Sequence, residues 1–533
     1  MPDLQPSYDA VVVGAGHNGL VTAAYLAKGG KKVAVFEKRN VEGGAAVTEE
    51  RWPGYRVSSL SYVNSLFRPE IVKELELKKF GYEMLPRSPS SFTPLPDGRH
   101  LLLGPDKELC RSEIAKFSAK DAAAYPRYEE RLEEISAILE PLLTKTPIDP
   151  GDLSVSSLLE YGGFALGHRK LLQDRWPELV RFLTGSATDL LDRWFESDVL
   201  KATLATDAVI GANAGPGTPG TAYVLFHHVM GECNGARGVW GYMKGGMGGL
   251  TQSLAGACRA LGVDIFVGAP VARVLTEDGR VRGVVLADGR EVRASVVASN
   301  ADPNVTFNRL VEAKDLPPEF LRDVSRISYD SASVKINLAL SELPDFKACP
   351  GKTAGPQHRG TIHIAPGMAY LDRAYADSVA GRWSRDPILE CTIPSVVDPS
   401  VAPPGKHLMN IFVQYGPYKL ADGKTWDTER EAFGDRCLEV LGQYAPNLPG
   451  AVLHRQVLTP LDMEREYSLT GGSIHQGRMS LDQMFNMRPL PGWSDYRTPL
   501  AGLYLCGASC HPGGGVMGAA GLNAARTILG DDL

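Results

Sequence analysis

Runs of apolar residues near the start of the chain are separated by a segment of different, helix-like composition. Residues 11–13 are three valines and residues 33–36 are again apolar, so each run predicts a buried strand of a parallel sheet. The alanine-rich segment between the two runs predicts a helix. The first 44 residues therefore predict a βαβ unit.

The pattern of apolar positions changes farther along the chain. Helical spacing over residues 107–143 and 156–210 departs from alternating strands and helices, and indicates a second domain. Turns at Asp278-Gly279 and Asp288-Gly289 separate alternating segments that predict antiparallel β structure. Further strands are predicted at 263–267, 296–300, 334–340, 389–393, 407–414 and 503–507, short strands and loops over 57–110, and helices at 250–261, 428–444 and 516–526.

Size and composition place the chain among ordinary globular proteins. A length of 533 residues exceeds a single hydrophobic core, and roughly 100–200 residues per domain predicts two to four domains. Hydrophobic residues make up 44% and charged residues 22%, and the net charge of −6 gives no reason to expect nucleic acid as a partner. The first seven residues lack targeting features, so we expect a cytoplasmic location, with a mitochondrial location left open for related members.

Three glycines follow the first predicted strand at a spacing that suits a dinucleotide phosphate. Gly14 permits a tight turn, Gly16 lets the backbone approach a pyrophosphate, and Gly19 lets the helix pack close to the sheet. The N-terminus of the following helix presents unpaired N–H groups and the positive end of its dipole. The motif predicts that this turn binds the phosphates of an adenine dinucleotide.

An acidic residue ends the second predicted strand. Glu37 lies eighteen residues after Gly19, where its carboxylate can accept hydrogen bonds from ribose hydroxyls. The same carboxylate repels a 2′-phosphate, which favours FAD or NAD over NADP.

Three more segments complete a pattern found in flavoproteins. They are Gly43-Gly44, Pro270-Val271, and Gly507 together with residues 513–521. With the N-terminal unit they resemble the glutathione-reductase-like flavoproteins, in the branch of phytoene desaturases, carotenoid isomerases and amine oxidases. The resemblance implies FAD as the cofactor, bound by Gly14, Gly16, Asn18, Gly19, Glu37, Lys38, Gly43, Gly44, Val271, Gly507, Met517 and Gly518.

A closer likeness extends over nearly the whole chain. Residues 10–50, 194–211 and 511–521 are similar to the pyridine nucleotide-disulfide oxidoreductase domain-containing protein 2 family. Disulfide reductase chemistry is nevertheless not expected, because residues 43–60 contain no cysteine pair and no second GxGxxG unit follows. Ala45 stands where amine oxidases usually carry arginine, which weakens the transfer of amine oxidase chemistry.

The resemblance implies an α/β fold: a glutathione-reductase-like FAD-binding Rossmann domain with an inserted mixed α+β substrate domain. We expect residues 1–85, 230–310 and 480–533 to form the discontinuous FAD-binding domain. Residues 86–229 and 311–479 then form the substrate domain. Small residues at 518–521 would let the N-terminus of the last helix approach the flavin ring, although tight packing of a helix on a sheet explains them as well.

Two histidines are the candidate catalytic residues. His511 directly precedes the last glycine run, and His475 lies in a segment that borders the substrate cavity in similar flavoproteins. A loop histidine that bonds the backbone is an equally good interpretation of His511. A dedicated base is not required for hydride removal, and neither a nucleophile–base pair nor a metal-ligand spacing is present.

These observations predict an FAD-dependent oxidoreductase. We expect it to dehydrogenate or isomerise a hydrophobic, polyene or lipid-like small molecule by hydride transfer to the flavin. An amine oxidase-like flavoenzyme and an FAD-stabilised regulatory or scaffold protein remain as alternatives. No nucleic acid partner is expected, while contact with a membrane surface and a homodimer are left open.

Overall fold

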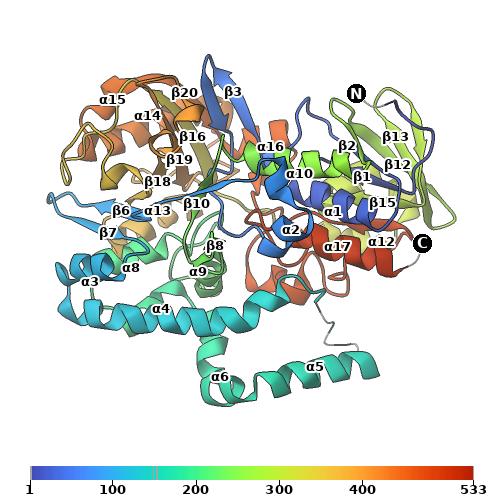
Figure 1. Cartoon of the computed structure of the whole chain (residues 1–533), viewed down its shortest axis with the longest axis horizontal. Coiled ribbons are helices and arrows are strands. Elements are labelled where there is room, and N and C mark those ends of the chain that lie inside the picture. The colour runs from blue at the N-terminus through green and yellow to red at the C-terminus, as the bar shows by residue number, and fades with distance from the viewer. Residues whose placement is uncertain (1–2, 148, 150, 152–153, 532–533) are drawn as a thin grey trace.

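The computed structural model describes residues 3–147, 149, 151 and 154–531, and it contains two large β-sheets with helices around them (Figure 1). The sheet near the chain termini has five strands, and the other has seven. Within the described residues, no helix is both long and apolar enough to cross a membrane.

The five-stranded sheet is parallel and has the order β11-β2-β1-β15-β21. Its strands are almost wholly buried, as expected of a parallel sheet. They form where the apolar runs predicted them, and the N-terminal βαβ unit is confirmed. The strands are β1 (Ala10–Val13), β2 (Val33–Phe36), β11 (Asp264–Phe266), β15 (Val296–Ser299) and β21 (Leu503–Leu505).

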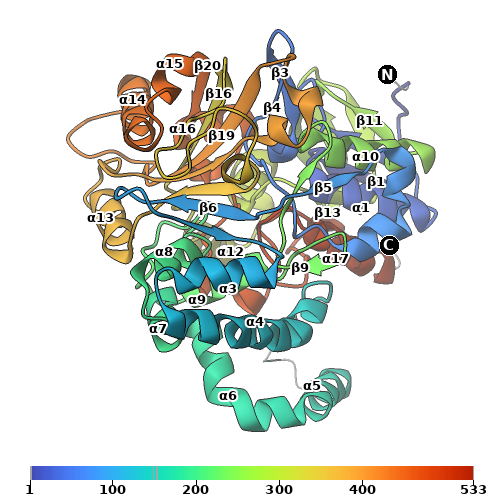
Figure 2. The same cartoon turned by 60° about the vertical axis from the view of Figure 1, so that its left-hand side comes forward.

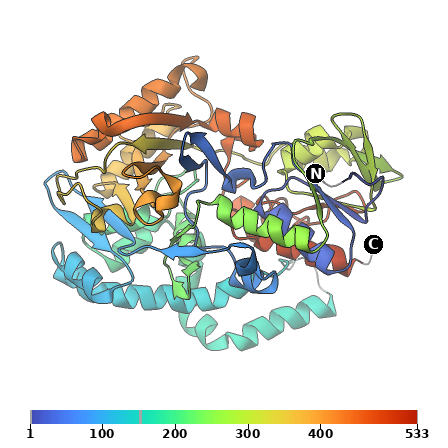
Figure 3. The ribbon, with the colours of Figure 1, turned by 45° about the horizontal axis from the view of Figure 1, so that its top comes forward.

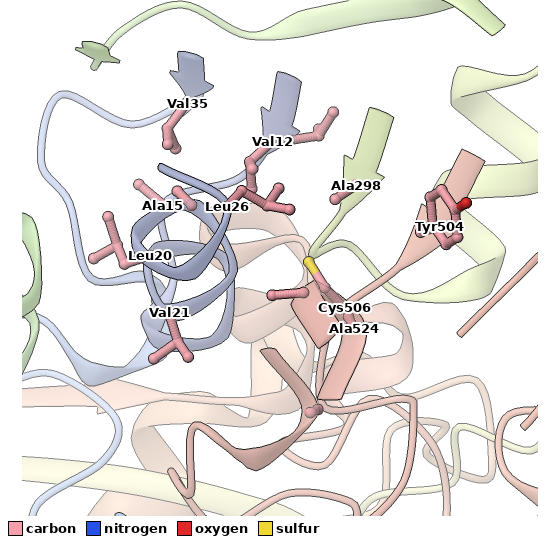
Figure 4. Close-up of a cluster of buried hydrophobic side chains, with 14 of the residues drawn as sticks. Val12, Ala15, Leu20, Val21, Leu26, Val35, Ala298, Tyr504, Cys506 and Ala524 are labelled. Carbon is pink, nitrogen blue, oxygen red and sulfur yellow. The ribbon is translucent and has the colours of Figure 1, made fainter. Parts of the chain in front are cut away.

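Three helices pack together beside this sheet, namely α1 (His17–Lys28), α10 (Gly248–Ala260) and α17 (Ala519–Gly530). Figure 3 shows them as the blue, green and red helices that lie side by side. Side chains of α1, α17 and the strands meet in one hydrophobic core, where Val12, Leu26 and Ala298 lie close to Cys506 and Ala524 (Figure 4). A small antiparallel sheet of β12 (Val271–Glu277), β13 (Arg280–Leu286) and β14 (Glu291–Arg293) contacts β15.

Helices α1 and α17 come from opposite ends of the chain and run parallel. A Cβ atom on Gly521 would lie 2.2 Å from the carbonyl oxygen of Asn18, and one on Gly29 would lie 2.6 Å from the Leu529 side chain. The Thr22 hydroxyl donates to the Gly521 carbonyl oxygen at 3.0 Å. Because matching ends are in contact, the two N-termini and the positive ends of both helix dipoles lie together.

The seven-stranded sheet has the order β20-β16-β19-β18-β17-β6-β7. Alternate residues of its strands, such as Val334 and Ile336, share a hydrophobic core with Trp426 and Phe433 of α14 (Trp426–Tyr444). The opposite face carries the other set of side chains. The strands are β6 (Ser91–Pro94), β7 (His100–Leu103), β16 (Ser333–Leu340), β17 (Thr361–Ile364), β18 (Ile388–Thr392), β19 (His407–Gln414) and β20 (Val452–Leu458).

The two predicted helical regions are confirmed. They contain α3 (Lys107–Ala115), α4 (Ala119–Leu139), α5 (Val155–Gly167), α6 (Arg169–Thr184), α7 (Ala187–Trp194) and α8 (Asp198–Ala205), and α9 (Thr221–Val229) follows them. Helices α5 and α6 extend away from the rest of the chain (Figure 2). Smaller elements are β3 (Thr48–Trp52), β4 (Tyr55–Ser58), α2 (Pro69–Glu74), β5 (Met84–Pro86), β8 (Glu232–Cys233), β9 (Ala236–Arg237), β10 (Gly241–Met243), α11 (Pro303–Val305), α12 (Pro318–Val324), α13 (Met368–Val379), α15 (Leu448–Ala451) and α16 (Pro460–Tyr467).

All strands of the five-stranded sheet lie within the residues predicted for the FAD-binding domain. All strands of the seven-stranded sheet lie within the residues predicted for the substrate domain. Helix α12 differs, because the boundary at residue 311 placed it in the substrate domain. Its Phe320 and Val324 instead pack in the same hydrophobic core as Val11 and Val12. The boundaries themselves stay a prediction.

Candidate functional site

The glycine turn after β1 is too tight for any larger residue. Gly14 has a φ of +94°, which favours glycine. A Cβ atom on Gly19 would lie 2.2 Å from the Gly14 carbonyl oxygen, and one on Gly16 would lie 2.7 Å from Asn300 Nδ2. The glycine turn, the start of α1 and the residue after β15 therefore lie close together, and the backbone of the turn can approach a phosphate.

The Glu37 carboxylate is held beside this turn. Its Oε2 accepts a hydrogen bond from the Ala15 N–H at 2.8 Å, and its Oε1 accepts one from the Arg39 N–H at 2.9 Å. The Ala269 N–H donates to the Glu37 carbonyl oxygen at 2.8 Å, which brings Val271 at the start of β12 into the same region. Each carboxylate oxygen keeps a lone pair for a further donor, such as a ribose hydroxyl.

The second glycine pair lies directly against the first turn. The Gly43 N–H donates to the Ala15 carbonyl oxygen at 2.9 Å, and Gly43 has a φ of +127°. A Cβ atom on Gly44 would lie 3.2 Å from Gly16 Cα. Asn18 Oδ1 is buried nearby and has no hydrogen-bond partner among the described residues. These residues fit a dinucleotide cofactor, which would bind against the glycine turns and offer new donors and acceptors.

The C-terminal glycine segment leads into α17. Gly518 precedes the helix with a φ of +74°, and a Cβ atom there would lie 2.8 Å from Ile71 Cδ1. Met517 is buried, and its carbonyl oxygen accepts a hydrogen bond from the Arg68 N–H at 3.0 Å. The structure thus brings Met517 and Gly518 to the N-terminus of α17, beside the N-terminus of α1.

Two of the residues predicted to bind the cofactor, Lys38 and Gly507, instead contact other parts of the protein. The Lys38 side chain is exposed, and its Nζ donates to Ser468 Oγ at 2.6 Å, so its ammonium group is engaged by the protein itself. Gly507 lies where a Cβ atom would be 2.5 Å from Gln476 Oε1 and 2.7 Å from the Asn300 carbonyl oxygen. Close packing of protein atoms alone accounts for this glycine.

A cavity of about 540 Å³ begins at this dinucleotide region and extends to the seven-stranded sheet. At one end it is lined by His17, Ala45, Ala46 and residues 514–516. Most of its wall is apolar. The apolar lining residues are Leu60, Val63, Leu103, Leu132, Leu204, Ile210, Leu225, Val229, Met230, Val239, Trp240, Phe412, Met463 and Ile474.

At its other end the cavity is lined by a row of side chains from four neighbouring strands. In the sheet register Lys335 lies opposite Phe412, Phe412 opposite Glu390, and Glu390 opposite His363. We call these four residues the cross-strand row. Because side chains alternate along a strand, the row lies on the face opposite α14, and all four residues line the cavity.

Lys335 is buried in the cross-strand row with only 1% of its surface exposed. Its Nζ donates to Asn337 Oδ1 at 2.5 Å and to Asn410 Oδ1 at 3.0 Å, and it lies 5.3 Å from the centre of the Tyr62 ring. Burial holds the pKa of Lys335 well below its ordinary value. The ammonium group therefore releases its proton more readily than that of a lysine on the surface, and the neutral amine is more easily formed.

Glu390 accepts a hydrogen bond from the Tyr62 hydroxyl at 3.2 Å, and its Oε1 lies 3.8 Å from His363 Nδ1. Burial and the nearby Asp207 carboxyl raise the pKa of Glu390 to about 8. Burial likewise raises the pKa of Asp207 to about 7, although Arg87 opposes this change. Both carboxyls can therefore keep or lose a proton near neutral pH.

The two predicted catalytic histidines lie in different places. His475 lines the cavity, its Nε2 is 3.2 Å from the Ile210 carbonyl oxygen, and burial lowers its pKa to about 3. His511 lies outside the cavity lining, and its Nε2 is 3.0 Å from the carbonyl oxygen of Leu142. His511 thus has the arrangement of a loop histidine bonded to the backbone, one of its two interpretations, and a catalytic role for it stays a prediction.

The cross-strand row and its neighbours Arg87 and Asp207 are functional candidates that the sequence pattern did not predict. A signal was present, because Lys335 and Glu390 are single charged residues within predicted apolar strands. Such residues are almost never buried without a specific reason.

The cysteines do not support disulfide chemistry. All eight lie in the described part of the chain, and none forms a disulfide. Burial raises the pKa values of Cys506 and Cys510, the nearest pair in sequence, to about 12, so both thiols stay protonated.

Known proteins resemble the chain over nearly its whole length. A family model described as "Flavin containing amine oxidoreductase" matches residues 19–529. The "Pyridine nucleotide-disulfide oxidoreductase domain-containing protein 2" of Rattus norvegicus is 47% identical, with 99% of this chain and 94% of that protein covered. One of the limonene dehydrogenase subunits of Castellaniella defragrans is 28% identical, with 98% of this chain and 94% of that protein covered.

A solved structure shares the fold. Cyclohexylamine oxidase from Brevibacterium oxydans matches with a TM-score of 0.56 and 15% identity, over 99% of this chain and 98% of that chain. At this sequence identity the match shows a shared α/β fold and nothing about activity. Together with the family match and the dinucleotide-binding geometry, it leads to one conclusion: the chain is an FAD-dependent oxidoreductase and belongs to the flavin-containing amine oxidoreductase family.

Proposed function

We propose that the protein dehydrogenates or isomerises a hydrophobic small molecule, with FAD bound in a glutathione-reductase-like domain. The cavity carries this proposal, because its wall is mostly apolar and it leads from the dinucleotide-binding region to the cross-strand row. The parallel sheet with the small sheet of β12, β13 and β14 beside it supports the choice of domain type. The name of the limonene dehydrogenase relative points to a hydrophobic substrate for that protein.

The residues of the chain have three tasks in such a reaction. Bound FAD supplies the ring that accepts a hydride. Apolar lining residues such as Leu225 and Val239 bind the substrate and exclude water. Lys335 and Glu390 hold protons at Nζ and at the carboxyl, within the cavity where a substrate proton would have to be taken up or returned.

An amine oxidase is the second candidate function. The rings of Tyr62 and Phe412 stack at 6.1 Å in the cavity wall, beside the Glu390 carboxyl, and a carboxylate with aromatic neighbours suits an amine. Against this candidate, Ala45 lines the cavity at the position where amine oxidases usually carry arginine.

Anaerobic reduction of the flavin tests both candidates. Hydrophobic alkenes, polyenes, lipids and amines are added in turn to the purified holoenzyme, and the flavin absorbance near about 450 nm is followed. Bleaching by non-amine substrates is the expected result. Bleaching by amines alone would overturn the proposal in favour of an amine oxidase, and no bleaching by any class would favour the scaffold alternative.

A further inference from the structure

Four buried or half-buried ionisable groups gather at the end of the cavity next to the seven-stranded sheet. Arg87 and Asp207 lie beside Glu390 and His363 of the cross-strand row, and all four line the cavity. Arg87, His363 and Glu390 expose only 3%, 6% and 4% of their surface. Burying charged groups costs free energy, and fold stability alone does not require a cluster of this kind. The cluster therefore indicates that this end of the cavity recognises a polar group of a ligand.

Protein contacts hold most of these groups in place. Arg87 Nε donates to the Trp240 carbonyl oxygen at 3.0 Å, and its Nη1 donates to Thr361 Oγ1 at 2.8 Å. His363 Nδ1 lies 3.1 Å from Thr206 Oγ1. The Asp207 carboxyl is different, because it has no hydrogen bond to any side chain or backbone group in the described ranges. Groups held by the protein therefore surround one carboxyl that lines the cavity without a hydrogen-bond partner among the described residues.

The mixture of charges decides which ligand group fits. A ligand carboxylate would be repelled by Asp207 and Glu390 when these carboxyls are ionised, and a ligand ammonium would be repelled by the Arg87 guanidinium, so each charged ligand group finds at least one unfavourable neighbour. A hydroxyl carries no charge, and it can donate to a carboxyl and accept from a nitrogen donor at once. A pure hydrocarbon offers the Asp207 carboxyl no hydrogen bond.

We propose that this polar end of the cavity binds a hydroxyl group of the substrate, so that the substrate is a hydrophobic alcohol. The inference rests on the proposed function and narrows its substrate class. The hydroxyl serves for recognition, and no bond to it is formed or broken. The apolar body of the alcohol then extends along the wall toward Ala45, Ala46 and residues 514–516.

A matched series of ligands tests the inference through binding. Octanol, octane, octylamine and octanoate are titrated into the oxidised holoenzyme, and the perturbation of the flavin spectrum gives each Kd. We expect octanol to bind about tenfold more tightly than each of the other three, as one satisfied buried hydrogen bond implies. Equal binding of octane, or tighter binding of octylamine or octanoate, would overturn the inference.

Substitutions test whether Glu390 and Asp207 cause the preference for octanol. Glu390→Met should remove most of the preference for octanol over octane, and Asp207→Leu provides the same test if the first variant fails to fold. Glu133→Met is the matched control, because Glu133 lines the same cavity but is exposed. An unchanged preference in a folded Glu390→Met or Asp207→Leu variant contradicts the inference.

Failure of this inference is distinguishable from failure of the proposed function. Anaerobic bleaching by hydrocarbons without any preference for alcohols overturns the inference and leaves the proposed function standing. A clear preference for octanol in binding, with no flavin bleaching by any non-amine substrate, overturns the function and leaves the recognition site standing.

Discussion

Lys335 is buried on one face of β16, while its chain neighbours Val334 and Ile336 are buried on the other. Val334 and Ile336 pack under α14, while Lys335 lies on the cavity face and bonds two asparagines. Burying a charged amine costs several kcal/mol of solvation free energy. A functional role would explain why the chain retains this residue. Its position in the cavity wall indicates a role in proton transfer.

Replacement of this lysine tests that role. We expect Lys335→Met to slow anaerobic flavin reduction by a good substrate by about 10²- to 10⁴-fold, the usual effect of losing an acid–base group. Flavin content and melting temperature should not fall, because an apolar side chain is easily buried. Lys406→Met, at an exposed position, is the control. Stopped-flow rates that match those of the unmodified protein would exclude the role.

Glu390 makes the stability of the protein depend on pH. Its pKa rises from 4.5 to about 8 on folding, so the folded state retains a proton that the unfolded state releases. Its contribution to stability is full below pH 4.5 and is lost as pH rises through 8. Glu390→Gln lacks this loss, and the variant should therefore gain stability relative to the original protein between about pH 5 and about pH 9. Melting temperatures at both pH values measure the change, and a constant difference would contradict it.

The pair of helices α1 and α17 has one contact that only glycine permits. Gly521→Ala would place a methyl group 2.2 Å from the Asn18 backbone, so the helices must separate. We expect a loss of about 1–3 kcal/mol in the free energy of unfolding and a lower flavin content. Gly530→Ala in the same helix has no atom within 4 Å and should be neutral or slightly stabilising. Denaturant unfolding compares the two, and equal effects would refute the packing argument.

The elements themselves could be predicted from local sequence, but the register between them could not. The valine runs and the Gly14–Gly19 spacing identified the dinucleotide-binding unit, since both signals lie within a short segment. The cross-strand row instead joins residues 335, 363, 390 and 412 from four strands. Their alignment depends on the pairing of distant strands, which a one-residue slip would change completely. For this reason the sequence predicted the cofactor region and missed the polar end of the cavity.

At the scale of the whole molecule, buried histidines predict sensitivity to acid. Burial lowers the pKa values of His227, His228, His363, His475 and His511 to about 3 or 4. The unfolded chain takes up protons at these residues below about pH 6.5, whereas the folded chain does not. Their contribution is therefore present above that pH and is lost as pH falls toward about 4.

The five histidines outnumber Asp207 and Glu390, the two carboxyls whose pKa values are raised to about 7 and about 8 and which act in the opposite direction. The net result should be a melting temperature that falls clearly between about pH 7 and about pH 5. Differential scanning calorimetry of the holoenzyme measures it. A flat profile over this range would show that the histidines are protonated without unfolding.

The contact between α1 and α17 also constrains when the protein can become functional in a cell. Helix α17 emerges from the ribosome long after α1, because most of the residues described here lie between the two helices. Until then the first glycine turn lacks the helix that packs beside it. Stable retention of FAD thus has to follow the synthesis of α17, and a bound flavin marks a chain that was synthesised beyond this helix.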